Sequence, residues 1–524
     1  MDLFWPDKFT KELLETKGKK DHVISSMITP SGPIHLGNLR GEILTAWAIY
    51  KSLKDKGIKA KFIFIADNFD HLRTLYPFLP KKFEKYIGQP LSEIPDPFGC
   101  HKSYDKHFLA PFFDALKILK IEPEIFYADK LYKEGVYTEV IKTALSNTLK
   151  IKEIIQEVTH AKLPSNWSPF VPICSKCGKL TDTEVLFTDL EANLVTYRCK
   201  CGNKGIADFS KGEGKLRWRI HWPAGWKVFK ITIEPFGKDH ATPGGSYDTG
   251  KRIAKEVFGI EPPFPIACEW VYLKGKGAMA GSTGVVLTPI EALKFLKPEI
   301  LKYILLRPDI SRHIELDLGL GILDQIDDFI ELEKAYLKSK GKCDFARAYE
   351  FSLIEKRRKK ILPHIPSRHF INTVQSAAGN LKEIKRILRK TGYGKELKNE
   401  KLLKEQISKF LNWIENYAPS DLKFEVQKEL PQKAKKLKSK QKEFLKELAK
   451  LIKEKQWKPE DLHNEIYKLI KKMDLTPKEG FQAIYLVILG RISGPKAGWF
   501  LSILDKDFLI KRFKQASRGE NNGD

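Results

Sequence analysis

The first 160 residues alternate between short apolar runs and stretches of helical periodicity. The runs His22–Ile28, Lys61–Ala66 and Glu124–Ala128 have the length and composition of buried strands. After the first run a helix is expected to start near Asn38, because apolar residues then recur every three or four positions, at Leu39, Ile43, Leu44, Trp47 and Leu53. Strands that alternate with helices form parallel sheets covered on both faces. This half of the chain is therefore predicted to be an α/β domain of the doubly wound, Rossmann type.

The rest of the chain changes its periodicity twice. Residues 227–234 alternate like a strand and run into a glycine-rich polar turn, after which a helix is expected over residues 249–258. Residues 346–516 are predicted to be almost entirely helical. Three apolar stripes recur there: Ile371, Val374, Ala377, Leu381, Ile384 and Leu388; Leu403, Ile407, Phe410, Leu411 and Ile414; Leu437, Phe444, Leu445, Leu448, Leu451 and Ile452. Such stripes bury against one another, so we expect an all-α domain and, after it, a disordered polar tail at 517–524.

The net charge of the chain favours one class of partner but does not establish it. The chain has 92 Lys and Arg residues against 66 Asp and Glu, which gives a formal net charge of +26. This excess favours a polyanionic partner, but lysine enrichment also marks hyperthermophile proteins. A lysine run on or near the helix of the third stripe has two interpretations, an RNA-facing patch or a solvated helix face. It comprises Lys433, Lys435, Lys436, Lys438, Lys440 and Lys442.

Apolar runs and cysteines together indicate a cytoplasmic protein. No apolar run approaches the ~20 residues of a membrane span, and the N-terminus has no basic region followed by an apolar signal segment. Seven cysteines in 524 residues do not make a disulfide framework. Their clustering indicates metal binding in a reducing cytosol instead.

A short Pro/Gly turn links the first predicted strand to the first helix. It reads Thr29-Pro30-Ser31-Gly32-Pro33-Ile34-His35-Leu36-Gly37-Asn38. Free N–H groups at the helix start suit such a turn to an anion such as phosphate, and its two glycines allow a ligand to approach the backbone closely. His35 and Asn38 add side-chain donors where charge builds on a phosphoryl oxygen. The alternative is an ordinary strand–turn–helix with a chance histidine.

Two groups of residues have the composition of zinc sites. Cys174-x-x-Cys177-Gly178 and Cys199-x-Cys201-Gly202 form two knuckles, and four thiolates predict a closed, structural zinc site. The null alternative is four unmetallated thiols. A second, closely spaced group comprises Asp96, Cys100, His101 and His107. All four are competent zinc ligands, although from the residues alone scattered surface positions are the commoner outcome.

Several motifs resemble one enzyme family, in its order and at about its spacing. His35-Leu-Gly-Asn38 resembles the "HIGH" signature of class I aminoacyl-tRNA synthetases, and the fuller turn resembles class I lysyl-tRNA synthetase. Further similar blocks are Leu216-Arg-Trp218-Arg-Ile-His-Trp222-Pro, Gly237-Lys-Asp239-His240-Ala, Gly245-Ser-Tyr-Asp248 and Gly490-Arg-Ile-Ser-Gly-Pro495. The family also carries an Asp/Cys/His/His zinc set in the region of Asp96. From the residues alone, the stretch after Gly237 fits a ribose and amino-acid site, and the less favoured alternative is a polar turn that caps the next helix.

The resemblance implies activation of lysine by ATP with Mg²⁺ and transfer of lysine to its tRNA. His35, Asn38 and Lys276 are then expected to be catalytic. The expected ATP-binding residues are Thr29, Pro30, Ser31, Gly32, His35, Gly37, Asn38, Gly237, Asp239, Met279 and Ser282. Thr29, Trp218 and His240 are expected to bind lysine, with two structural zinc ions elsewhere.

The resemblance also divides the chain. Residues 1–160 and 216–290 are expected to be the two halves of the Rossmann catalytic domain, and 161–215 a zinc-binding insertion between them. Residues 291–345 are expected to form a connecting region that contacts the tRNA stem. An anticodon-binding helical domain is expected over residues 346–516.

One expected catalytic loop departs from the family pattern. Where the family has "KMSKS", this chain has Ala278-Met279-Ala280-Gly281-Ser282, so both lysines are missing. Either Lys274 or Lys276 substitutes from upstream, or activity is weak, or the chain is altered from its active form. Met27 and Cys268 are smaller departures near the expected lysine site. Two alternatives therefore stay open: a non-catalytic tRNA-binding paralogue, and a class I synthetase for a different amino acid such as glutamate or cysteine.

Overall fold

The computed structural model describes residues 3–281, 284–355 and 364–518, and these form two compact units. Unit 1 comprises residues 1–316 and 338–358, and unit 2 comprises residues 317–337 and 359–524. The strands of unit 1 are β1 (His22–Ile28), β2 (Ala60–Ala66), β3 (Glu124–Tyr127), β4 (Phe170–Pro172), β5 (Thr183–Asp189), β6 (Leu194–Cys199), β7 (Lys204–Asp208), β8 (Gly214–Leu216), β9 (Ile233–Gly237), β10 (Phe264–Cys268), β11 (Val271–Leu273), β12 (Gly277–Ala278) and β13 (Ile314–Leu316).

Helices of unit 1 lie between these strands, as the periodicity predicts. They are α1 (Trp5–Lys17), α2 (Leu36–Asn38), the π-helical turn η1 (Leu39–Leu44), α3 (Thr45–Asp55), η2 (Lys81–Tyr86), α4 (Tyr104–Ile118), α5 (Ala128–Lys133), α6 (Thr138–Ser146), α7 (Thr148–Thr159), α8 (Trp218–Phe229), η3 (Lys238–Ala241), α9 (Ser246–Glu256), α10 (Pro289–Leu293), α11 (Pro298–Leu306) and α13 (Ala346–Ser352).

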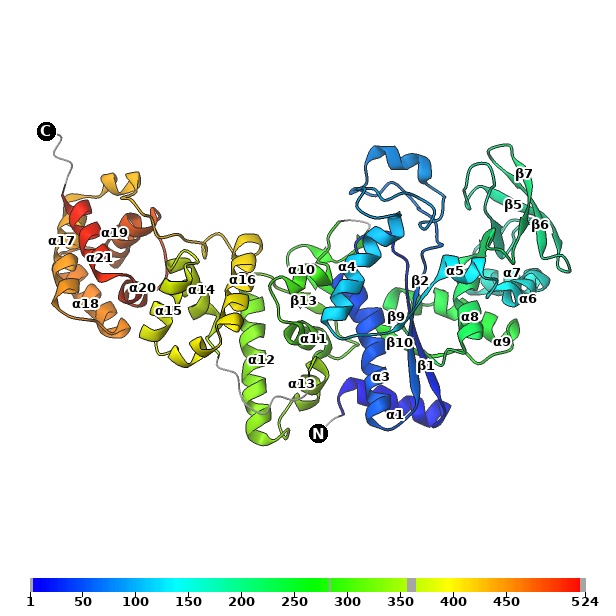
Figure 1. Cartoon of the computed structure of the whole chain (residues 1–524), viewed down its shortest axis with the longest axis horizontal. Helices are drawn as coiled ribbons and strands as arrows, with labels where there is room; N and C mark the ends of the chain where they lie inside the picture. Colours follow the sequence, from blue (N-terminus) through cyan, green and yellow to red (C-terminus); the bar gives the residue numbers. More distant parts are fainter. Residues whose placement is uncertain (1–2, 282–283, 356–363, 519–524) are drawn as a thin grey trace. The chain divides into compact units, whose positions relative to one another are not determined.

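A five-stranded parallel sheet in the order β10-β9-β1-β2-β3 is the core of unit 1, which confirms the predicted α/β class (Figure 1). β1 and β2 pair in parallel along their whole length, from His22 opposite Ala60 to Ile28 opposite Ala66. Their carboxyl ends lead into the turn at Thr29 and into Asp67, while β9 and β10 lead into Lys238 and Glu269 at the same edge. Ligands of open parallel sheets bind at this edge.

The predicted strand at residues 227–234 is wrong. The chain is helical through Phe229, and β9 begins only at Ile233. Tryptophans four residues apart explain the difference, because Trp218 stacks on Trp222 with 5.4 Å between ring centroids, and Trp226 packs against Trp222 in turn. This spacing continues one face of a helix. Lys230 ends that helix in a left-handed conformation.

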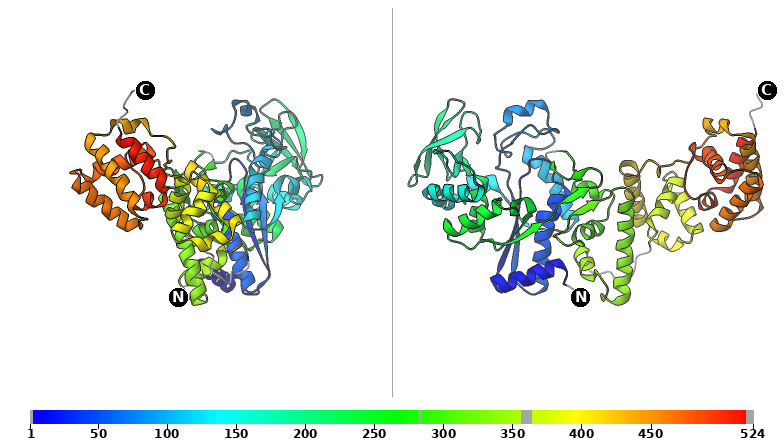
Figure 2. Two further views of the ribbon diagram at one scale, coloured as in Figure 1. Left: turned by 60° about the vertical axis from the view of Figure 1, so that its left-hand side comes forward. Right: turned by 180° about the vertical axis from the view of Figure 1, so that it is seen from behind.

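A small antiparallel sheet, β5-β6-β7, contains one of the two predicted cysteine knuckles at its edge. It stands apart from the parallel sheet in both Figure 1 and Figure 2. β4 and β8 form a second antiparallel pair, and the chain then continues through α8 to β9 of the parallel sheet. The knuckles use their glycines as expected, since Gly178 and Gly202 both have positive φ, at 71° and 86°.

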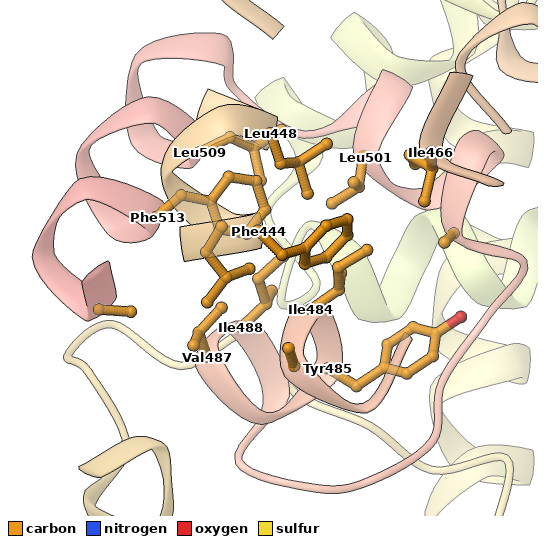
Figure 3. Close-up of a cluster of buried hydrophobic side chains, with 14 of the residues drawn as sticks. Phe444, Leu448, Ile466, Ile484, Tyr485, Val487, Ile488, Leu501, Leu509 and Phe513 are labelled. Carbon is orange, nitrogen blue, oxygen red and sulfur yellow. The ribbon is translucent and has the colours of Figure 1, made fainter. Parts of the chain in front are cut away.

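Unit 2 is helical, as predicted. Its elements are α12 (Leu320–Ser339), which runs on into unit 1, and α14 (Ser367–Ser376), α15 (Leu381–Lys390), η5 (Gly394–Lys398), α16 (Glu400–Asn416), η6 (Gln432–Lys436), α17 (Ser439–Glu454), α18 (Pro459–Lys472), α19 (Pro477–Leu489), α20 (Ala497–Ile503) and α21 (Lys506–Ser517). Figure 3 shows part of its core, where Phe444 and Leu448 of α17 meet Ile484 and Ile488 of α19 and Phe513 of α21.

Three details of the helical prediction need correction. The first stripe belongs to two helices, because Ala378 and Gly379 both adopt positive φ and separate α14 from α15. In the second stripe Leu411 is 42% exposed, and Trp413 is buried in its place. Most of the lysine run precedes α17, which starts only at Ser439.

Of the predicted tail, Ser517 is the last residue of α21, and residues 519–524 lie outside the described residues. Within the described ranges every helix is too short or too polar to span a bilayer.

Candidate functional site

Two adjoining cavities open at the carboxyl edge of the parallel sheet. The turn cavity, of about 540 Å³, lies over the Thr29–Asn38 turn and reaches Met279. The tryptophan cavity, of about 750 Å³, extends from the same turn to Trp218 and the loop at Gly244. Their shared lining residues are Ile28, Thr29, Ser31, Asn38, Glu42, Arg73, Asp239 and His240. Two ligands held in these cavities would therefore meet at this shared wall.

Most of the residues predicted from the sequence line these cavities. The turn cavity is lined by Thr29, Ser31, Gly32, His35, Gly37, Asn38, Gly237, Asp239 and Met279. Thr29, Trp218 and His240, expected at the amino-acid site, line the tryptophan cavity. Two predicted residues do not line either cavity: Pro30 is buried in the turn, and Lys276 is exposed between β11 and β12. A third, Ser282, lies outside the described residues.

His35 caps its own helix, which corrects the expectation of free amides at the helix start. Its Nδ1 accepts hydrogen bonds from the N–H groups of Gly37 and Asn38, at 3.1 and 3.4 Å. The ring therefore carries its proton on Nε2. Burial lowers the pKa of His35 to about 4, so the imidazole is neutral at pH 7. His35 is thus a fixed, uncharged donor, while Asn38 Oδ1 accepts from the His35 amide and keeps its NH₂ group available.

Glu42 is the site residue that the sequence analysis missed. It lies in the π-helical turn η1 and lines both cavities. Its Oε2 is shielded from solvent and has no hydrogen-bond partner in the part of the chain that the structure describes. Burial, and then the nearby charge of Asp239, raise the pKa of Glu42 to about 8. A buried carboxyl group that lines a cavity and has one oxygen without a partner could pair with a cationic group of a ligand. The only sequence signal was an acidic residue four positions after Asn38, next to the apolar pair Ile43 and Leu44.

Arg40 fixes the helical turn that carries Glu42. Its buried guanidinium donates to the carbonyl oxygens of Leu305, Glu269 and Asp309, at 3.2, 3.0 and 2.9 Å. Thr45 Oγ1 donates back to the Arg40 carbonyl at 2.7 Å. A π-helical turn is rare in α-helices and frequent at functional sites. These hydrogen bonds hold the Glu42 backbone in place.

An aromatic wall closes the tryptophan cavity. Trp218 and Trp222 stack, and the His240 ring lies 5.8 and 5.5 Å from their ring centroids. Trp218 Nε1 donates to Ser246 Oγ at 3.1 Å, which orients the ring. Aromatic faces cover the methylene chain of a ligand and attract a cationic group. The two cavities together therefore offer an acidic and aromatic lining.

The loop at Ala278–Gly281 lies against the Thr29–Asn38 turn. Ala280 N–H donates to the Val285 carbonyl at 3.1 Å, which folds the loop back on itself. A Cβ atom on Gly281 would lie 3.3 Å from the Pro33 carbonyl oxygen, a close approach that glycine permits. Met279 of the same loop is buried. In this arrangement the loop offers backbone groups, and no lysine side chain, to the turn cavity.

The four cysteines of the two knuckles converge at one point. Sγ atoms of Cys174 and Cys201 are 3.6 Å apart, those of Cys177 and Cys199 are 3.7 Å apart, and all four lie within 4.8 Å of one another. Two thiolates bound tetrahedrally to one zinc ion at about 2.3 Å lie about 3.8 Å apart. All four cysteines are free thiols. Their geometry fits a zinc ion, with no position left for a substrate.

The side chains of the second predicted metal group also meet at one point. Cys100 Sγ lies 3.1 Å from His101 Nδ1 and 3.2 Å from His107 Nδ1. Asp96 completes the group, with one carboxylate oxygen 3.1 Å from His107 Nδ1 and the other 3.6 Å from His101 Nδ1. Tetrahedral zinc with these ligand types separates its ligand atoms by about 3.3–3.6 Å. This group fits zinc as well.

Comparison with known proteins agrees with this geometry. A family model described as "tRNA synthetases class I (K)" matches residues 3–355, and one described as "Anticodon binding domain" matches residues 371–517. The chain is 42% identical to Lysine--tRNA ligase 1 of Methanosarcina acetivorans, with 98% of each chain covered. It is 41% identical to Lysine--tRNA ligase of Archaeoglobus fulgidus, over 98% of this chain and all of that one.

Among solved structures, a glutamate tRNA ligase from Elizabethkingia meningosepticum covers 95% of this chain at 14% identity. Its TM-score of 0.42 is too low to add to the argument. The family model spans more than half of this chain, and the relatives align over nearly all of it. The chain therefore belongs to the class I tRNA synthetases, in the group that this model describes as (K).

Proposed function

We propose that this chain is a lysine–tRNA ligase. The observation that carries the proposal is the carboxyl group of Glu42, which is buried where the turn cavity and the tryptophan cavity meet and whose Oε2 has no hydrogen-bond partner among the described residues. A lysine ammonium group is the natural partner of such a carboxylate, and the aromatic wall covers the methylenes that precede it. A glutamate side chain would meet the like charge of Asp239 and could form no ion pair with Glu42, so these two residues disfavour that alternative.

The proposed reaction has two steps. ATP lies against the Thr29–Asn38 turn, and the lysine carboxylate oxygen forms a bond to the α-phosphorus while the bond from that phosphorus to pyrophosphate breaks. The 3′-terminal ribose hydroxyl of the tRNA then attacks the carbonyl carbon, and AMP leaves. His35 Nε2–H and the Asn38 amide donate to phosphate oxygens as charge develops on them. Catalysis of this kind depends on positioning and electrostatics.

Mg²⁺ and zinc complete the proposed chemistry in different ways. Mg²⁺ would accompany the ATP phosphates and neutralise part of their charge. The cysteine group of the two knuckles would hold one structural zinc ion, and the Asp96 group a second. Neither group lines either cavity, so we assign both ions to folding. The free cysteines and the metal groups are consistent with a cytoplasmic location, which we propose.

A cavity lined by basic residues in unit 2 supports tRNA as the partner. A cavity of about 1140 Å³ between η6, α17 and α21 is lined by five basic residues and one acidic residue, Lys435, Lys442, Lys511, Lys514, Arg518 and Asp507. Cations gathered on one surface bind a phosphate backbone through counterion release. We propose this cavity, within the part that matches an anticodon-binding model, as part of the RNA surface.

Charging of tRNA tests the proposed function. We expect the purified chain, supplied with ATP, Mg²⁺ and a tRNA that carries a lysine anticodon, to form lysyl-tRNA and no other aminoacyl-tRNA from a panel of the twenty amino acids. Binding of this tRNA without charging would support the non-catalytic paralogue. Charging of a different amino acid would support a synthetase of different specificity. Either result would overturn the proposal.

A further inference from the structure

The reaction proposed above must bring two anions together in a site that is itself acidic. The carboxylate of the amino acid has to approach the negatively charged α-phosphate, and the turn cavity is lined by Glu42, Asp239 and Glu269. His35 adds no charge, because burial lowers its pKa to about 4. The loop residues that line the cavity, from Ala278 to Gly281, have no charged side chain. The approach of two anions therefore needs another source of positive charge.

Arg73 is the one arginine or lysine among the described residues that line the turn cavity. It also lines the tryptophan cavity, so it stands at the shared wall where the two substrates would meet. The tryptophan cavity has a second arginine, Arg219, but its guanidinium is committed to the Gly245 carbonyl oxygen and Thr249 Oγ1, at 3.0 and 2.9 Å. Arg73 is thus the cation best placed for the reacting groups.

Arg73 is bound to a network of buried charged side chains. Its Nη2 donates to Asp70 Oδ2 at 3.0 Å, and Asp70 lies at the end of the polar segment that follows β2. Asp70 Oδ1 lies 3.8 Å from Lys215 Nζ, and Lys215 donates to Asp67 Oδ1 at 2.8 Å. Lys215 is only 5% exposed, on strand β8 at the end of the cysteine-bearing insertion. This network fixes the carboxylate to which Arg73 is attached.

The guanidinium keeps donors available for a ligand. The Arg73 side chain is 61% exposed, and one of its nitrogens is used by Asp70. Among the described residues no further hydrogen-bond partner contacts Nε or Nη1. A guanidinium offers five N–H donors in a fixed plane that matches phosphate and carboxylate oxygens. Arg73 therefore combines a fixed attachment with free donors, which a phosphate-binding residue requires.

We propose that Arg73 binds the α-phosphate of ATP as the amino-acid carboxylate attacks it, and so supplies a positive charge that the described loop residues of the turn cavity do not supply. This inference rests on the proposed function. The carboxylate oxygen forms the new bond to phosphorus, and the bond to the pyrophosphate oxygen breaks. Arg73 neither gains nor loses a proton in this step. Its contribution is the stabilisation of negative charge on the equatorial phosphate oxygens.

Arg73→Ala is expected to lower kcat for lysine-dependent ATP–pyrophosphate exchange by about 10²–10³-fold, with the KM for lysine changed by less than about threefold. Arg73→Lys should retain part of the lost rate, because it keeps the charge but not the planar donors. Added guanidinium ion at millimolar concentration should restore part of the Arg73→Ala rate. Because the side chain is mostly exposed, the melting temperature should stay within about 2 °C of the parent value.

A matched control is Arg368→Ala. Arg368 is 57% exposed and also donates to one aspartate, Asp324, at 3.0 Å, but it belongs to the other unit. This variant should keep the parent rate and gain nothing from guanidinium. An Arg73→Ala rate within threefold of an active parent, or a loss that guanidinium does not rescue, would overturn the role of Arg73. An inactive parent would instead overturn the proposed function.

Discussion

Glu42→Gln is expected to raise the KM for lysine by about 10²–10³-fold. The substitution keeps the size of the side chain and removes the charge that would pair with the lysine ammonium. Loss of one partner of a buried charge pair costs about 2–5 kcal/mol, which corresponds to this change in affinity. The KM for ATP should change much less, because the Thr29–Asn38 turn is unaltered. Initial rates of pyrophosphate exchange over a range of lysine concentrations measure the effect.

Glu234→Gln is a closely matched control for this substitution. Burial raises the pKa of Glu234 to about 8, as it does for Glu42, but Glu234 lines neither cavity and accepts a hydrogen bond from Trp222 Nε1 at 3.2 Å. Its substitution should leave the KM for lysine within about twofold. A Glu42→Gln enzyme with the parent KM would remove Glu42 from the amino-acid site.

The raised pKa of Glu42 adds a pH dependence to the same experiment. With a pKa of about 8 the empty site is mostly protonated at pH 7, and only the carboxylate pairs with an ammonium group. The lysine side chain stays charged up to its own pKa near ~10.4. The KM for lysine should therefore fall as pH rises from 6 to 8 and level off above 8. Glu42→Gln should abolish this trend, and its persistence in the variant would assign it to another group.

Cys177→Ala is expected to release one zinc ion per chain and to unfold the sheet β5-β6-β7. Structural zinc sites of this kind contribute about 10–16 kcal/mol in isolated zinc peptides, and small sheets with few buried residues depend on them. Zinc content by mass spectrometry of the native protein should fall from about two ions to about one. Limited proteolysis should then cleave within residues 165–205, which the parent protects.

Two further variants separate the metal groups. Cys343→Ala removes a free cysteine that belongs to neither group, and it should leave zinc content and protease resistance unchanged. Cys100→Ala should release one ion, and the double variant with Cys177→Ala should release both. Unchanged stoichiometry in Cys177→Ala would contradict a zinc site at the two knuckles.

The parts that sequence alone could predict are those with strong local signals. Short apolar runs predict the strands around Ile24, Phe64 and Phe126, and the Pro and Gly residues after the first run predict the turn before His35. The spacing of the cysteines predicts that the four thiols converge, because two Cys pairs that are each followed by glycine are typical of a zinc site. In each case the information lies within a few consecutive residues.

The parts that sequence could not predict depend on contacts between distant segments. Glu42 looks like a solvent-facing helix residue until β9 and β10 bring Asp239 and Cys268 beside its turn. Arg73 gains its position from Lys215, which follows 142 residues later in the chain and acts through Asp70. The strand expected at 227–234 failed for a different reason, since stacked tryptophans at helical spacing outweighed a short alternation. The signals for Glu42 and Arg73 are not local, whereas the tryptophan spacing is a local signal that the alternation pattern obscured.

Lysine-dependent ATP–pyrophosphate exchange by the unaltered chain tests the central claim most directly. The assay is run with and without lysine, and with and without a tRNA that carries a lysine anticodon. The proposed site predicts exchange that requires lysine and that proceeds although Ala278, Ala280 and Gly281 replace the usual loop residues. Absence of lysine-dependent exchange under both tRNA conditions would contradict the claim, and the fold would then serve RNA binding without amino-acid activation.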